Sequence, residues 1–349
     1  MAPALVLALS LILVPQIPVV FQEDPTALSE EMQRFVDENI DSSLPEYERL
    51  EQLVRVVFQE NRLGFTYDKT SRTARRTFEE RNGNCLSFTN MLISMARYLD
   101  LDARFREVEI PPIWSRRGRL VILSRHINVD VKIGAQSFVV DLFPEVNPVQ
   151  LGGQVVSDAR GLAHFYNNKG AEHLAKGQPA LAAESYQMAI DSDPEASFAW
   201  VNMGVARSHQ GRLEEAEGCY LKALKLDRQD SVAMSNLGDL YRKMGRQDLA
   251  EKWAKKVTRF RNKNPYYHFA LGERAYWTGE FKESVLHYRA ALKRNSREHH
   301  FYFALAKAYM QLGDLEEVVE ALRKAKKHAP DQFGRDRYDQ KLEILAANF

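Results

Sequence analysis

The chain has little cysteine and almost no excess charge. Its 349 residues include two cysteines, Cys85 and Cys219, and 48 Lys or Arg nearly balance 47 Asp or Glu, which gives a net charge of +1. Two cysteines cannot build a disulfide framework, and neither stands at metal-ligand spacing from a second ligand. The sequence therefore excludes a disulfide-stapled or zinc-ribbon fold, and we expect no metal and no organic cofactor.

Long apolar runs are equally scarce. Residues 4–14 (ALVLALSLILV) are eleven residues, apolar except for Ser10, which is short for a membrane span and suits the core of a secretory signal. No Lys or Arg precedes this run and no Ala-x-Ala site follows it. We predict that residues 1–22 export the protein to the periplasm or cell envelope, as a cleaved signal or as a short membrane anchor. A buried N-terminal helix or a mis-assigned start is the alternative.

Cys85 is the first candidate for chemistry. The polar segment 81–84 (RNGN) precedes it, and an apolar helical pattern begins with it. A helix N-terminus presents free backbone N–H groups and partial positive charge, which stabilise a thiolate and can hold an oxyanion. The alternative is that Cys85 is only a small buried residue.

Residues 125–133 (RHINVDVKI) alternate polar and apolar side chains, as a half-buried strand does. The next residues, Gly134 and Ala135, suit a two-residue type II′ turn that pairs Ile133 with Gln136 and so fixes every later pair. The predicted apolar pairs are Ile127 with Leu142, Val129 with Val140 and Val131 with Phe138. The other face carries His126, Asn128 and Asp141, with Asp141 opposite Asn128 and diagonal to His126, within hydrogen-bond reach.

Three segments together resemble the transglutaminase-like cysteine acyltransferase and protease superfamily. They are GNCLSFTNMLISMARYLDLDARF, RHINVDV and VVDLF, between residues 50 and 145. The resemblance implies an α+β, papain-like fold in which a Gly-x-Cys opens a helix packed on a sheet. It further implies that Cys85 is the nucleophile, His126 the base and later the acid, and Asp141 the residue that orients the imidazole.

The implied reaction is acyl transfer from a peptide or amide substrate. Water as acceptor gives a peptidase or amidase, an amine gives a transglutaminase, and the residues do not distinguish them. We predict that Asn84, Trp114 and Asn128 contact substrate, although Trp114 could equally be a core residue. The competing class is an inactive domain that keeps the fold and serves as a scaffold.

A spacing of 34 residues governs the rest of the chain. Small residues recur in three registers: Gly170, Gly204, Gly238, Gly272 and Ala306; Ala182, Ala216, Ala250, Ser284 and Val318; Ala189, Ala223, Val257, Ala291 and Ala325. Tyr186, Tyr220 and Tyr288 fill between them. This pattern resembles the tetratricopeptide repeat, in which the two helices of each unit cross closely.

We therefore predict two domains. An α+β transglutaminase-like domain occupies residues 23–160, and an all-α tetratricopeptide solenoid of five units occupies residues 163–332. Residues 333–349 are predicted to form a capping helix, because a solenoid must cover its last apolar face.

Such solenoids bind an extended peptide or another protein along the concave face, so we predict a protein or peptide partner. The positions predicted to line an aromatic groove are Phe198, Val201, Tyr266, Phe269, Tyr276 and Phe303. For these residues, packing on one another or on the first domain is the alternative.

A basic stretch lies within the repeats. Residues 222–263 hold twelve Lys or Arg and five Asp or Glu, a net charge of +7. Basic clusters attract acidic surfaces. No base-stacking pattern accompanies this one, so we do not expect nucleic acid as a partner. Anionic envelope polymers or lipid head groups are favoured, and a solvated helix face is the alternative.

Overall fold

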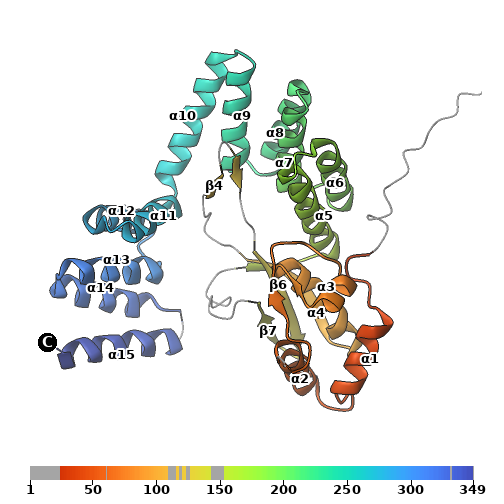
Figure 1. Ribbon diagram of the computed structural model, residues 1–349. Helices are drawn as coiled ribbons and strands as arrows, with labels where there is room; N and C mark the ends of the chain where they lie inside the picture. Colours follow the sequence, from red (N-terminus) through yellow and green to blue (C-terminus); the bar gives the residue numbers. More distant parts are fainter. Residues whose placement is uncertain are drawn as a thin grey trace, which may run out of the picture.

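The computed structural model describes residues 24–348, apart from residues 60, 109–114, 118–119, 123–125, 143–152 and 331. Figure 1 shows an α+β region followed by successive helix pairs, so the predicted fold class is confirmed. In the described part, no helix combines the length and apolar character that a membrane span requires. The segment predicted to direct export lies outside the described residues.

Helix α4 (Cys85–Tyr98) is the centre of the N-terminal region. Residues 86–96 are all buried, because elements on several sides pack against this helix. The helices that contact it are α1 (Glu30–Asn39), α2 (Glu46–Phe58) and α3 (Ala74–Glu80). A helix enclosed in this way meets solvent mainly at its ends, and Cys85 stands at the first of them.

A four-stranded antiparallel sheet packs on α4. Its strands, in spatial order, are β7 (Gln136–Val140), β6 (His126–Ile133), β3 (Asp102–Val108) and β8 (Gly153–Val156). Two short strand pairs complete the region: β1 (Thr66–Tyr67) lies parallel to β2 (Asn82–Gly83), and β4 (Ser115–Arg117) pairs with β5 (Leu120–Ile122). Strand β2 leads directly into the N-terminus of α4.

The hairpin of β6 and β7 has the predicted register. The pairs are Val129 with Val140, Val131 with Phe138 and Ile133 with Gln136. Gly134 has a φ of 57°, and Ala135 is absent from the described non-glycine residues with positive φ, which are the φ signs of a type II′ turn. Strand β7 ends at Val140, so the predicted pair of Ile127 with Leu142 falls beyond the regular ladder.

The repeat array, which we define as α5–α14, consists of five helix pairs (Figure 1). They are α5 (Asp158–Ala175) with α6 (Pro179–Ser192), α7 (Ser197–His209) with α8 (Leu213–Leu226), α9 (Ser231–Lys243) with α10 (Gln247–Lys263), α11 (Pro265–Trp277) with α12 (Phe281–Arg294), and α13 (His299–Leu312) with α14 (Leu315–His328). Helix α15 (Gln332–Asn348) follows and packs on α14.

Tyrosine rings sit against glycines within these pairs. A Cβ added at Gly170, Gly204 or Gly272 would lie 2.4–2.6 Å from the ring of Tyr186, Tyr220 or Tyr288, respectively. The third pair differs, because Ala254 takes the place of the tyrosine. A Cβ at Gly238 would come no closer than 3.7 Å to any neighbour. Glycine is therefore sterically required in three of the pairs and not in the α9/α10 pair.

The first helices of the array share a core with the N-terminal region. One cluster of buried apolar side chains includes Phe105 of β3, Phe165 of α5 and Met203 of α7. Gly161 lets α5 approach the sheet, since a Cβ there would lie 2.6 Å from the Phe105 ring. Buried His164 of α5 also contacts Glu107 of β3. Apolar and polar contacts thus join the two regions.

Matched glycine substitutions test this packing. We expect Gly204→Ala to lower the free energy of unfolding by about 1–3 kcal/mol, because the methyl group would overlap the Tyr220 ring. Gly238→Ala should raise it by about 0.5–1 kcal/mol, because alanine favours the helix and meets only ordinary van der Waals contacts. Urea denaturation of both variants measures the difference, and equal effects would contradict the packing described.

Candidate active site

The backbone before α4 is held by Asn84, the N-cap residue. The Asn84 Oδ1 accepts the backbone N–H of Ser87 at 3.0 Å and the Ser87 hydroxyl at 3.0 Å. Gly83 permits the close approach of β2, since a Cβ there would lie 2.5 Å from the Ser87 Cβ. This cap fixes the first turn of a 14-residue helix, whose N-terminal partial positive charge lies at Cys85.

His126 and Asp141 meet at the start of the hairpin. The Nε2 of His126 lies 2.5 Å from Oδ2 of Asp141, and Nδ2 of Asn128 donates to the same oxygen at 3.0 Å. Asn128 is fully buried, and the side chains of Asp141 and His126 are 2% and 13% exposed. Because a carboxylate only accepts, Nε2–H is the donor, and Nδ1 is left to meet the thiol.

His126 also lies within interaction range of Cys85. Burial lowers the pKa of His126, but its hydrogen bonds to Asp141 and Cys85 and the negative charges of both raise it more strongly, to about 9. At neutral pH the imidazole is therefore protonated and lies beside Asp141. Cysteine, histidine and aspartate, distant in sequence, form one connected group.

Two of the three residues predicted to contact substrate lie in the described part of the structure. Asn84 caps α4 with its side-chain oxygen and donates its amide to the Ser71 hydroxyl. Asn128 is buried and bonded to Asp141, so it helps to hold Asp141 in place. Trp114 lies outside the described residues. In this structure the two asparagines hold neighbouring residues of the site in place and do not line its open surface.

Tyr67 belongs to the surroundings of Cys85 and was not predicted. Strand β1 pairs Tyr67 with Gly83, two positions before the cysteine. The Tyr67 side chain is large and 51% exposed. Partial burial, the Cys85 charge and Asp68 raise the pKa of its phenol. A strand of two residues has no periodic pattern, which is why the sequence gives no signal for it.

The predicted aromatic groove is not continuous. Phe198 and Val201 are 8% and 3% exposed and pack in the core, where Phe198 stacks on His164 with ring centroids 4.3 Å apart. For these two residues the structure therefore shows packing in the core rather than exposure in a groove. A side chain this buried offers almost no surface to a peptide.

The other four residues form two groups among α11, α13 and α15. Tyr266 and Phe269 pack on the ring of Phe301, at centroid distances of 5.3 and 4.9 Å. The Lys307 Nζ lies 5.1 Å from the ring centroid of Tyr276 and 5.9 Å from that of Phe303. These four aromatics are partly buried, and they also pack on rings outside the predicted groove, among them Tyr288, Phe281 and Tyr338.

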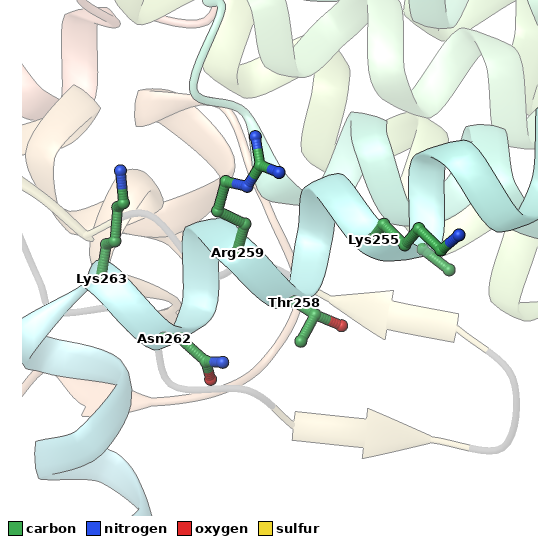
Figure 2. Close-up of a pocket in the computed structure, with 6 residues that line it drawn as sticks. Lys255, Thr258, Arg259, Asn262 and Lys263 are labelled. Carbon is green, nitrogen blue, oxygen red and sulfur yellow. The ribbon is translucent and has the colours of Figure 1, made fainter.

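A surface groove of about 510 Å³ lies along α10 (Figure 2). The described residues that line it are Ala254, Lys255, Thr258, Arg259, Asn262 and Lys263. The three cations recur every four residues and therefore share one helix face. All three are exposed, and Arg259 and Lys263 project side by side in Figure 2. Three of the twelve Lys and Arg side chains of residues 222–263 are thus on one accessible face.

Among the described residues, one group could bring three metal-ligand atoms together. Glu298, His299 and His300 place these atoms within 4.8 Å of one another at the start of α13. The Nδ1 of His299 is already bonded to the Tyr338 hydroxyl at 2.8 Å. The partial positive charge of a helix N-terminus also disfavours a cation there, so we assign no metal to this group.

Comparison with protein families gives two matches. Residues 162–342 match the cilia and flagella-associated protein 70 C-terminal domain, and residues 33–138 match the transglutaminase-like superfamily. No curated protein matches the chain.

Solved structures similar to this chain are repeat proteins. YrrB, described as a TPR protein with an unusual peptide-binding site, is 18% identical, and the match covers 51% of this chain and 92% of YrrB with a TM-score of 0.27. The second TPR of Spaghetti (RPAP3), bound to the HSP90 peptide SRMEEVD, is 22% identical over 30% of this chain and 95% of that one, with a TM-score of 0.29. MamA from Desulfovibrio magneticus RS-1 is 18% identical over 49% and 96%, with a TM-score of 0.28.

The raised pKa of His126 makes stability depend on pH. A group whose pKa rises on folding, here from 6.5 to about 9, stabilises the fold below the lower value and loses that contribution as pH rises through the higher one. We expect His126→Gln to lose about 3 kcal/mol more relative to wild type at pH 6 than at pH 10. Urea denaturation at both pH values measures this, and a pH-independent difference would contradict it.

Proposed function

Because the chain belongs to the family with the cilia and flagella-associated protein 70 C-terminal domain, and has a transglutaminase-like domain before it, we propose that it couples cysteine-dependent acyl transfer to partner binding. The transglutaminase-like domain acts on an amide of a peptide or protein. The repeat array holds the protein that supplies this amide or works with it.

One observation carries the catalytic half of the proposal. His126 binds Asp141 through Nε2 and also contacts Cys85, at the N-terminus of a buried helix. A thiol, an imidazole and a carboxylate in that order are the parts of a nucleophilic triad. A lone buried cysteine would need neither partner.

The reaction follows from these positions. The His126 imidazole, whose pKa is raised to about 9, already holds the proton that the thiol has given up, and the Cys85 sulfur attacks the carbonyl carbon of the amide as a thiolate. Free N–H groups in the first turn of α4 stabilise the oxyanion. As the C–N bond breaks, the His126 proton passes to the leaving amine and a thioester remains. Water or a second amine, deprotonated by His126, attacks the thioester and releases the Cys85 thiolate.

We include export in this proposal on the basis of the apolar run at residues 4–14. The periplasm or cell envelope would then be the working compartment. Cys85 and Cys219 are free thiols in the structure, so in an oxidising compartment the site must be shielded from oxidants.

Alkylation of Cys85 tests the catalytic half without a known substrate. We expect iodoacetamide to label Cys85 readily at neutral pH in wild type, and at least about tenfold more slowly in His126→Ala and Asp141→Ala, because the thiolate loses its cationic partner or that partner's support. Mass spectrometry of the labelled peptides measures both rates across a pH series.

Cys219 is the internal control. Burial is the main cause that raises the pKa of this thiol, so it should label slowly in all three proteins. If Cys85 shows the same ordinary thiol titration in wild type and both variants, the domain is a scaffold that has kept the fold without turnover, and the array does the biological work.

The groove on α10 supports the binding half of the proposal, with an acidic peptide segment as the ligand. Cations four residues apart on a helix are separated by about 6 Å along its axis, and alternate side chains of an extended peptide by about 6.6 Å. Thr258 and Asn262 stand between the cations and can bond the peptide backbone. No aromatic side chain is among the described residues that line the groove, so it lacks a surface for stacking nucleic-acid bases.

Charge reversal tests this groove. We expect Lys255→Glu, Arg259→Glu and Lys263→Glu together to weaken binding of a fluorescent Glu-Ser-Glu-Ser-Glu peptide at least about tenfold, because carboxylates lose three cationic partners. The matched control reverses the exposed Lys282, Lys293 and Lys327, which carry the same charge on α12 and α14. Fluorescence anisotropy at low salt measures both, and equal weakening would show a general charge effect only.

A further inference from the structure

We propose that Glu172, on the first helix of the repeat array, is a positioning residue for Cys85 and acts through Ser71 and Asn84. This inference rests on the proposed acyl-transfer function. Through Ser71 and Asn84, the repeat array then influences the reactivity of the Cys85 thiol.

The network begins at the cap of α4. Asn84 Oδ1 accepts the Ser87 backbone N–H at 3.0 Å, and Asn84 Nδ2 donates to the Ser71 hydroxyl at 2.7 Å. Both ends of the Asn84 amide are therefore used, which fixes the orientation of the side chain. Since Cys85 follows Asn84 directly, fixing Asn84 also fixes the backbone position from which the Cys85 side chain extends.

Ser71 connects this cap to the array. It is 3% exposed, and its backbone N–H donates to Glu172 Oε1 at 2.7 Å across 101 positions of sequence. Lys169, one turn earlier on α5, bonds Glu172 Oε2 at 2.8 Å and the Ser71 carbonyl at 3.4 Å. Two charged side chains of α5 thus hold one buried serine between them.

The residues beside Ser71 also hold the first turn of α4. The Thr70 carbonyl accepts the backbone N–H of Asn84 at 3.4 Å. At 3.2 Å it shares the single Ser87 hydroxyl hydrogen with Asn84 Oδ1, and the Arg72 N–H donates to Ser87 Oγ at 2.8 Å. Residues 70–72 therefore bond the cap on one side and α5 on the other. A displacement at Glu172 is passed to the cap through a single short segment.

This connection affects chemistry because catalytic geometry tolerates little error. A misplacement of about 1 Å can cost on the order of a hundredfold in rate. Without Glu172, the buried Ser71 N–H loses a charge-assisted hydrogen bond and must find another partner. The segment 70–72 would then relax, and the distance between Cys85 and His126 would vary more widely.

The experiment compares three variants of the full chain. Glu172→Ala removes the acceptor, Glu172→Gln keeps an oxygen for the Ser71 N–H, and Glu184→Ala removes an exposed glutamate on α6 as the control. We expect Glu172→Ala to slow neutral-pH alkylation of Cys85 about tenfold and to flatten its His126-dependent pH profile. Glu172→Gln should stay within about twofold of wild type, as should Glu184→Ala.

Hydrogen exchange gives a second readout that does not depend on catalysis. In Glu172→Ala, amides in residues 84–90 should exchange faster, because the cap of α4 loosens, while those of α7 and α8 stay unchanged. If Glu172→Ala fails to fold, Ser71→Ala replaces it, since this variant keeps the N–H but removes the hydroxyl that accepts from Asn84. It should slow alkylation and speed exchange in the same residues.

The two proposals can fail separately. If wild-type Cys85 titrates as an ordinary thiol, the proposed function fails, and exchange at residues 84–90 alone decides the positioning role. Alkylation unaffected by Glu172→Ala in a protein with an activated thiol would overturn the positioning role while leaving the function intact. Exchange and alkylation equal to those of Glu184→Ala would overturn it in every case.

Discussion

The N-terminal region depends on how the start of a buried helix satisfies its backbone donors. The first turn of any helix leaves N–H groups without partners, and a helix enclosed like α4 can expose few of them to water. The side-chain oxygen of Asn84 accepts one of these N–H groups, that of Ser87. Gly83 allows strand β2 to approach the Ser87 side chain. The one N-terminal position that remains accessible belongs to Cys85. Capping of the α4 N-terminus therefore also places the Cys85 thiol beside His126.

A second constraint comes from the hairpin that carries His126 and Asp141. Its register is set by apolar alternation on one face and by a turn that only glycine enters easily, at Gly134. Once Val129 and Val131 are buried, His126 and Asn128 must lie on the other face, where Asp141 reaches both. Burial of the apolar side chains and the contact between His126 and Asp141 both follow from the pairing of β6 with β7.

These features explain which parts of the molecule could be predicted. The hairpin and the repeats follow from local periodicity, so Val129 opposite Val140 and Tyr220 beside Gly204 were accessible to sequence reasoning. Tyr67, in a strand of two residues, and Glu172, far along the chain from Ser71, have no local signal. Phe198 and Val201, two of the predicted groove positions, are buried by contact with α5 or neighbouring repeats. Only a tertiary structure supplies that information.

The shared core has a consequence for what counts as an independent folding unit. Apolar side chains from Met32 to Ala206 form one cluster, so it continues through α5 and α6 into α7. A chain cut between the α+β region and the repeats would expose Phe165 and Tyr166 on one side and Phe105 on the other. The core shared with the α+β region therefore ends within the repeat array rather than before it. A change in the later repeats therefore reaches the Cys85 region less readily than a change in the first helix pair, whose side chains are part of the shared core.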